Sequence, residues 1–233
     1  MIDFYYAPTP NGWKVAIMLF EANIEHRTIL MRLAKGDQFT PAFLAINPNA
    51  KMPAIVDHDG EGAPVNVFES GSILLYLAEK VKRFAPTDVA GKRELLQWLF
   101  WQAASQGPMA GQLSHFVNYA PKGHDYSLNR YKGEYERNLG VLEHRLQTRD
   151  YVMGDYSIAD MMIFPWVFIA KPLSVSLEAF PKIVAWRQAI KTRPAVQQAI
   201  DLFKGEQNTG KTSAEENSLL FNQTAAHLEQ FSR

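Results

Sequence analysis

The chain of 233 residues contains no cysteine. This absence excludes structural disulfides, thiolate metal sites and any nucleophilic or redox-active thiol supplied by the protein itself. The histidines show none of the close spacings, such as HExxH, that are typical of metal sites, so we expect no bound metal. Any thiol chemistry that the protein performs therefore requires a thiol from another molecule.

Net charge and long apolar runs are also missing. The 24 basic and 24 acidic side chains cancel, whereas a nucleic-acid-binding protein is expected to carry a basic face. No apolar run approaches the roughly 20 residues that a membrane-spanning helix needs. The first ten residues, MIDFYYAPTP, lack the basic flank and the cleavage site of a signal peptide. We expect a cytoplasmic protein that binds neither nucleic acid nor membrane.

The first eighty residues alternate between strand-like and helix-like segments. Strands are predicted at 2–6, 26–33, 52–60 and 64–69, and helices at 12–22, 41–47 and 69–81. The turn pair Asp59-Gly60 favours a hairpin between the last two strands. The order β-α-β-α-β-β-α implies a small sheet covered by helices.

Strand-like segments disappear between about residues 88 and 204. Helices are predicted there at 89–106, 125–147, 157–169, 178–192 and 194–204. This change favours two domains, an α/β domain at 1–83 and an all-helical domain at 88–204. The polar C-terminal tail, 205–233, is interpreted as a mobile segment, with a cover over a groove as the alternative.

The segment YAPTPNG lies between the first predicted strand and the first predicted helix. Unpaired backbone N–H groups make such a turn a common place for chemistry. The turn itself, APTPNG, contains no histidine, acid or lysine, and only Thr9 and Asn11 carry polar side chains in it. The turn offers hydrogen-bonding groups but no strong nucleophile.

A second candidate site is the segment FESGSILLYL, where a strand gives way to a helix. Ser70 is positioned to cap the helix and to donate a hydrogen bond to an anion at its positive end. Glu69 is suited to accept from an ammonium group. Together they suit the carboxylate and ammonium of an α-amino acid, but from the motif alone a plain helix cap is the simpler interpretation of Ser70.

The segment NPNAKMPAIVD places a proline at the start of a strand. Pro53 cannot donate a hydrogen bond to a neighbouring strand, which favours an edge position or a cis peptide bond. A cis bond would turn the backbone of Met52 outward, where it could pair with an extended peptide. The alternative is an ordinary trans proline.

These motifs together resemble a known superfamily. MPAIVD, followed by FESGSILLYLAE, resembles the thioredoxin-like domain of the glutathione transferases, and SIAD at 157–160 resembles the capping motif of their helical domain. APTPNG, KGDQF, NPNAKMPAIVDHDG and LQWLFWQ resemble the bacterial nu class, the disulfide-bond oxidoreductase type. The resemblance covers about residues 1–204. It implies an α/β thioredoxin-like N-terminal domain followed by an all-α domain, usually in a homodimer.

The resemblance also assigns the ligand. Glu69 and Ser70 would hold the γ-glutamyl group of glutathione, Met52 before a cis Pro53 would pair with the cysteinyl unit, and Gln38 would reach the glycyl end. These assignments imply one oxidised or two reduced glutathione molecules in the site.

Three further residues complete the implied site. Thr9 and Asn11 would lie beside the thiol, and we expect Asn11 to favour ligand binding and Thr9 the thiolate. Arg130, in SLNRYKGEYE, lies where the class carries a basic residue towards glutathione, often from the neighbouring subunit. A solvated helix arginine is the alternative.

Two other motifs are interpreted as structural. Ser157 and Asp160 have the spacing of a capping box and are expected to hold a helix start in the core. The aromatic residues of LQWLFWQ, Trp98, Phe100 and Trp101, are expected to pack in the core and between domains.

The leading functional hypothesis is a glutathione-dependent disulfide reductase. A thiolate at a helix N-terminus is favoured by the helix dipole, and hydrogen bonds to it lower the thiol pKa further. Conjugation to an electrophilic substrate and peroxidase activity use the same site and remain alternatives, with Tyr5 and Tyr6 as weaker candidate donors. A non-catalytic binding module is the third alternative.

Overall fold

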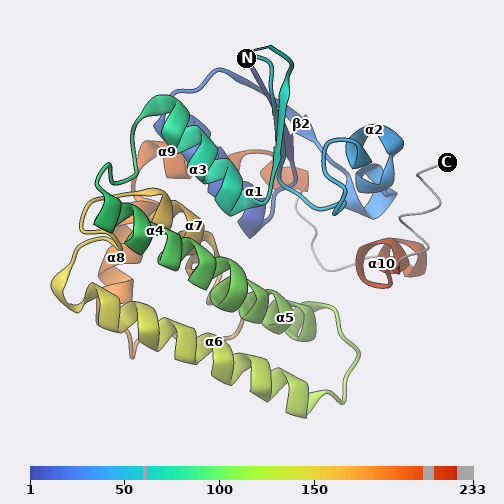
Figure 1. Cartoon of the computed structure of the whole chain (residues 1–233). Helices are drawn as coiled ribbons and strands as arrows, with labels where there is room; N and C mark the ends of the chain where they lie inside the picture. The colour runs from blue at the N-terminus through green and yellow to red at the C-terminus, as the bar shows by residue number, and fades with distance from the viewer. Residues whose placement is uncertain (60–61, 207–212, 225–233) are drawn as a thin grey trace. The chain divides into compact units, whose positions relative to one another are not determined.

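The computed structural model describes residues 1–59, 62–206 and 213–224. The chain divides into two compact units. The first consists of Met1–Leu77 and Ala199–Arg233, and the second consists of Ala78–Gln198. Figure 1 shows the α/β part in blue to cyan and the helices of the second unit from green to orange.

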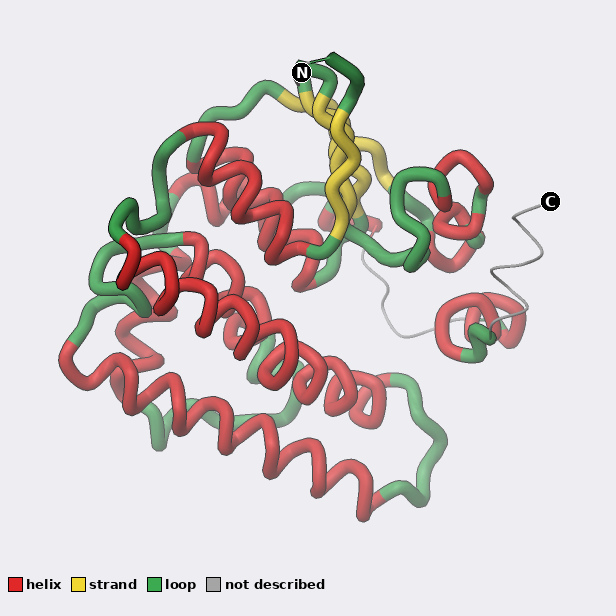
Figure 2. Tube along the Cα trace, viewed as in Figure 1, coloured by secondary structure: helices red, strands yellow, loops and turns green. Residues whose placement is uncertain are grey.

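A four-stranded mixed sheet forms the centre of the first unit (Figure 2). Its strands are β1 (Ile2–Tyr6), β2 (His26–Leu30), β3 (Ala54–Asp57) and β4 (Val65–Phe68). The strand order is β2-β1-β3-β4, with β1 parallel to β2 and the other two pairs antiparallel. The predicted hairpin between the last two strands is confirmed.

Two helices connect the first three strands, and a third follows the last strand. They are α1 (Pro10–Glu21), α2 (Pro41–Leu44) and α3 (Ser70–Val81), with short 3-10 turns η1 (Leu33–Lys35) and η2 (Asp37–Phe39) before α2. In Figure 1, α1 and α3 lie on one face of the sheet and α2 lies on the other. The βαβαββα order is therefore confirmed. The continuous apolar run in the middle of α1, residues 15–19, is fully buried, as expected for a helix enclosed within a core.

The C-terminal segment contains a helix that the sequence interpretation lacked. After α9 (Pro194–Asp201) and η5 (Lys204–Glu206), α10 spans Ala214–Phe221 and packs against η1. Its capping box pairs Ser213 with Glu216, and Lys51 donates a hydrogen bond to Gln223 just beyond the helix. Residues 213–224 thus form a helix that was not predicted, and whether the tail is mobile or covers a groove stays a prediction; residues 207–212 and 225–233 lie outside the described residues.

Helices account for most of the second unit. They are α4 (Val89–Trp101), the π-helical turn η3 (Gln102–Gln106), α5 (Gly107–Asn118), α6 (Asp125–Arg145), η4 (Leu146–Thr148), α7 (Ile158–Phe168) and α8 (Pro181–Lys191). Ten of the eleven residues of α7, Ile158–Val167, are buried, so α7 forms the centre of this unit. The predicted α/β and all-helical architecture is confirmed, although α5 was not predicted.

The capping box at the start of α7 is also confirmed. Ser157 Oγ accepts a hydrogen bond from the backbone of Ala159 at 3.2 Å, and the Asp160 carboxylate accepts one from the backbone of Ser157 at 3.0 Å. Both side chains are buried. The box therefore fixes the start of a core helix.

The aromatic residues of α4 are less buried than expected. Trp98 and Trp101 are half-buried and form an edge-to-face pair with ring centroids 5.3 Å apart. Phe100 is 69% exposed, so its prediction as a core residue is wrong. The buried positions of α4 are instead Leu95 and Leu99, because these side chains lie on the opposite side of the helix.

Among the described residues, no helix combines the length and the apolarity needed to span a bilayer.

Candidate functional site

The register of the sheet brings four chain segments to one edge. Tyr6 is paired with Leu30 on the parallel strand, and Tyr5 is paired with Ala54 on the antiparallel strand. Ala54 is in turn paired with Phe68. The segments that follow β1, β2 and β4 therefore meet the segment that precedes β3, and we call this end of the sheet the site edge.

Most of the predicted site residues belong to these four segments. They are Thr9 and Asn11 after β1, Gln38 after β2, Met52 and Pro53 before β3, and Glu69 and Ser70 after β4. Arg130 does not join them within the first unit. It is exposed on α6 of the second unit, where its guanidinium pairs with Glu134 at 2.7 Å.

The first segment is a tight turn into α1. Thr9 is the N-cap residue, and its hydroxyl accepts a hydrogen bond from Gly12 N at 3.3 Å and donates a long one to Ala7 O at 3.4 Å. A Cβ at position 12 would lie 2.2 Å from Ala7 O, so the close approach of the turn to α1 requires glycine. Asn11 is half-buried in the first turn of the helix, at the positive end of the helix dipole.

The second segment is the Glu69–Ser70 turn. Glu69 is exposed and has a φ of 66°, a left-handed conformation that is uncommon for residues other than glycine. Ser70 is buried and begins α3, and the carbonyl of Glu69 accepts from Ile73 N at 2.9 Å. The left-handed residue turns the chain sharply from β4 into the helix, which places Ser70 at the helix N-terminus.

A lysine that the sequence interpretation did not assign lies behind this turn. Lys14, on α1, is buried, and its Nζ lies 3.4 Å from Ser70 Oγ as the donor of a hydrogen bond. Burial lowers the pKa of Lys14 to about 7, and the nearby Glu69 carboxylate opposes this shift. A buried cation therefore contacts the residue that was predicted to bind an anion.

The remaining segments carry the other predicted contacts. The Met52-Pro53 peptide bond is cis, as predicted. Gln38 is buried, and its Nε2 donates to the carbonyl of Leu33 at 3.2 Å. Its Oε1 is buried without a hydrogen-bond partner among the described residues, which leaves one acceptor of this amide for a ligand.

No group of three or more histidine, aspartate and glutamate side chains in the described parts of the chain is arranged to hold a metal ion.

Comparison with known proteins identifies the class to which this fold and site belong. The family model for the glutathione S-transferase N-terminal domain matches residues 9–80, and that for the C-terminal domain matches residues 115–194. The chain belongs to the glutathione S-transferase family, which is a family of enzymes. The superfamily resemblance of the sequence motifs is confirmed.

Two curated relatives come from Escherichia coli strain K12. The disulfide-bond oxidoreductase YfcG is 46% identical over 204 residues, covering 86% of this chain and 94% of YfcG. The disulfide-bond oxidoreductase YghU is 40% identical over 211 residues, covering 84% of this chain and 73% of YghU.

Similar solved structures contain glutathione. A glutathione transferase from Burkholderia graminis, with two glutathione molecules bound per subunit, has a TM-score of 0.83 and 43% identity, covering 87% of this chain and 88% of that one. A glutathione transferase from Pseudomonas putida, with one glutathione disulfide bound per subunit, has a TM-score of 0.83 and 37% identity, covering 87% and 91%.

Proposed function

We propose that this protein is a glutathione-dependent disulfide-bond reductase of the nu-class type. The observation that carries the proposal is the turn into α1, which has the position of a thioredoxin-type active site but holds Thr9 and Asn11 in a chain without cysteine. The names of the two Escherichia coli relatives support disulfide chemistry. A reducing cytoplasm, where glutathione is maintained in its thiol form, is the corresponding location.

The residues of the site edge fit the parts of glutathione. Ser70 and the N-terminus of α3 suit the γ-glutamyl carboxylate, because the helix end carries partial positive charge. The exposed Glu69 carboxylate suits the adjacent ammonium. The backbone of Met52 suits the cysteinyl unit, and the unpaired Gln38 Oε1 suits the glycyl N–H.

Glutathione supplies the thiol, and the protein stabilises its ionised form. An ordinary thiol has a pKa of about 8.5, and only the thiolate attacks a disulfide efficiently. The α1 N-terminus favours a negative charge by about 0.3–1 kcal/mol when exposed and up to about 2 when partly buried. The Asn11 amide and the Thr9 hydroxyl would add hydrogen bonds to the thiolate. To do so, Thr9 would turn its hydroxyl proton away from Ala7 O, to which it donates only a long hydrogen bond, and towards the sulfur.

The reaction is two successive thiol–disulfide exchanges. The first glutathione thiolate attacks one sulfur of the substrate disulfide, forms a mixed disulfide and releases the other half as a thiolate, which takes up a proton. A second glutathione thiolate then attacks the glutathione sulfur, releasing the second thiol and glutathione disulfide. Relatives with two glutathione molecules or one glutathione disulfide per subunit are consistent with both stages.

Substitution of the two polar residues of the turn tests this proposal. We expect Thr9→Ala and Asn11→Ala to lower kcat/KM for glutathione-dependent reduction of 2-hydroxyethyl disulfide by about 10- to 100-fold, because each removes a hydrogen bond to the thiolate. Thr9→Ser keeps the hydroxyl and the helix cap, and should retain most of the rate. Binding of S-methylglutathione, measured by calorimetry, should persist in the Thr9 variants and weaken in Asn11→Ala, because Asn11 is expected to favour ligand binding.

The outcomes separate the alternatives. Full activity in both alanine variants, with glutathione still bound, would show that these residues do not assist the thiolate. Faster conjugation of an aryl halide than disulfide reduction by the wild-type protein would favour a conjugating transferase. Lack of binding to both reduced and oxidised glutathione would favour a non-catalytic module.

We also propose a homodimer. Leu96 and Phe100 lie one turn apart on α4 and are 40% and 69% exposed, so this helix presents apolar side chains to solvent. Arg130 would then act from α6 of a neighbouring subunit, as the resemblance implies. Its present partner, Glu134, would have to share or release the guanidinium.

A further inference from the structure

Lys14 is the feature of the site edge that the proposed function leaves unexplained. It is 2% exposed, and it is the only lysine or arginine that is buried among the described residues. Burial of an ammonium group is costly, and lysine is rarely buried unless it is paired. Methionine or leucine would fill a similar volume in this core without that cost.

The position of Lys14 connects the two helix N-termini of the site edge. Its backbone belongs to the second turn of α1, which starts at the proposed thiol-binding turn. Its Nζ donates to Ser70 Oγ at the first residue of α3. Glu69, the charged side chain that acts on the ammonium, lies in the turn from β4 to α3. The cation thus lies directly behind the residues proposed to hold the amino-acid head of glutathione.

This arrangement has a defined effect on Ser70. A hydroxyl oxygen that accepts a hydrogen bond from an ammonium must direct its own proton away from that ammonium. The charge behind the turn also adds to the partial positive charge of the α3 N-terminus. Both effects favour an anion in front of Ser70.

We propose that Lys14 is a positioning residue that acts through Ser70 to bind the α-carboxylate of the γ-glutamyl group. The inference rests on the proposed binding of glutathione at the site edge. It adds a buried cation, contributed by α1, to a subsite formed by the β4–α3 turn. Lys14 itself does not contact the reacting sulfur in this role.

Binding should be coupled to a proton. Burial lowers the Lys14 pKa to about 7, so the ammonium is largely deprotonated at pH 8. A bound carboxylate near Ser70 would favour the charged ammonium and raise that pKa again. Binding of S-methylglutathione, whose sulfur cannot ionise, should therefore take up a proton from solvent at pH 8, and its affinity should fall as the pH rises from 6 to 9.

Calorimetry with matched ligands tests the proposal. The probes are S-methylglutathione, whose sulfur cannot ionise, and the same compound without the α-carboxylate of its γ-glutamyl unit. Lys14→Met should weaken S-methylglutathione binding at pH 7 by about tenfold, or about 1.4 kcal/mol, and leave the decarboxylated probe nearly unaffected. Lys80→Met removes an exposed lysine from the last turn of α3 and should bind both probes like the wild-type protein.

A double-mutant cycle tests the route through Ser70. If Lys14 acts through the hydroxyl, Lys14→Met should cost clearly less affinity in a Ser70→Ala background than in the wild-type protein. Proton uptake, obtained from binding enthalpies in buffers of different ionisation enthalpy at pH 8, should occur in the wild-type protein and disappear in Lys14→Met. The wild-type measurement needs no variant, so it stands even if a substitution impairs folding.

The results distinguish this inference from the proposed reaction. Equal loss of affinity for both probes, or no proton uptake by the wild-type protein, would overturn the role of Lys14. Carboxylate-specific loss of affinity together with an absence of disulfide reduction would support Lys14 and contradict the reductase. Failure of the wild-type protein to bind S-methylglutathione would overturn both.

Discussion

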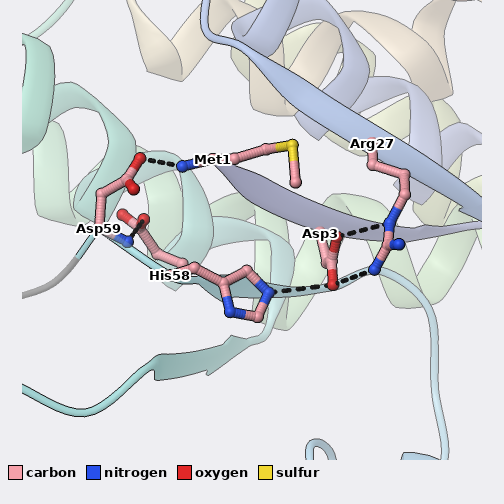
Figure 3. A network of polar contacts seen from close by, with 6 residues as sticks. Met1, Asp3, Arg27, His58 and Asp59 are labelled. Atoms are coloured by element: carbon pink, nitrogen blue, oxygen red, sulfur yellow. Dashed lines mark hydrogen bonds and ion pairs between the residues drawn. The ribbon is translucent and has the colours of Figure 1, made fainter.

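At the scale of single residues, the sheet has a second polar centre, shown in Figure 3. Asp3 is buried on β1 and accepts hydrogen bonds from the neighbouring Arg27 at 2.9 and 2.7 Å. His58 Nε2 lies 3.0 Å from the same carboxylate, and the N-terminal amine of Met1 pairs with Asp59. The hydrogen bond from Arg27, more than any other contact, holds the pKa of Asp3 below its usual value, while burial opposes this effect.

Asp3 should therefore stabilise the fold in a pH-dependent way. Because the folded-state pKa is lowered, its contribution is present above the unfolded pKa of about 3.9 and is lost as the pH falls through the folded value. We expect Asp3→Asn to lower the free energy of unfolding by about 1 kcal/mol at pH 7, a modest figure because Arg27 is largely exposed. Urea unfolding at pH 7, 5 and 3 should show the difference shrinking at the lowest pH.

The neighbouring Asp59 provides the control for this measurement. Its carboxylate and the N-terminal amine that pairs with it are both exposed, so Asp59→Asn should change stability by less than about 0.5 kcal/mol. A difference for Asp3→Asn that stays constant from pH 7 to 3 would show that its charge does not contribute.

The same scale shows which site residues can be predicted from the sequence. Pro53 and Ser70 stand at recognisable transitions between a loop, a strand and a helix, so their local roles are visible in short motifs. Lys14 has no such signal, because it lies within an apolar helical run and its partner is Ser70, 56 positions later. Its burial depends on the packing of α1 beside α3, which only the tertiary structure supplies.

At the scale of elements, Asp160 connects three parts of the helical unit. Its buried carboxylate accepts hydrogen bonds from the backbone of Val152 at 3.0 Å, from Trp186 Nε1 on α8 at 2.8 Å, and from the backbone of Ser157. Burial raises its pKa to about 6, although all these donors act in the opposite direction. The Asp160 side chain of the capping box therefore also holds α8, and the loop that precedes α7, against the start of α7.

Asp160→Ala should destabilise the protein by at least about 3 kcal/mol, because several buried donors lose their partner together. The capping box of α10 offers a matched comparison, since Ser213 and Glu216 form the same local contacts in an exposed setting. Glu216→Ala should cost less than about 1 kcal/mol. Urea unfolding of both variants measures the contrast, and similar losses would contradict the tertiary role of Asp160.

Element boundaries could be predicted where caps and periodicity agree. The helix predicted at 69–81 is α3 at Ser70–Val81, and the one predicted at 125–147 is α6 at Asp125–Arg145. α5 was missed because Gly107-Pro108 resembles a helix break, although proline is tolerated in a first helical turn, which here follows the π-helical turn. α10 was missed because its composition is polar and its packing partner, η1, is distant in the sequence.

At the scale of the whole molecule, the exposed apolar side chains of α4 bear on the oligomeric state of the protein. Leu96 and Phe100 form an exposed apolar pair on α4, and burying such a pair would stabilise an assembly. The sequence could not identify Phe100 as such a residue, because adjacent tryptophans and leucines surround it. Its exposure depends on which face of α4 packs inward.

If the proposed homodimer forms through α4, Phe100→Asp should shift the protein from dimer to monomer, because a carboxylate buried in an apolar contact loses its hydration without a partner. Size-exclusion chromatography with light scattering at micromolar concentration would measure the change, and circular dichroism should show unchanged helix content. Val184→Asp, on the exposed side of α8, is the control and should leave the mass unchanged. If Arg130 acts across the interface, monomeric Phe100→Asp should also lose glutathione affinity to the extent that Arg130→Ala does. A monomeric wild-type protein with full disulfide reductase activity would contradict both the dimer and this role of Arg130.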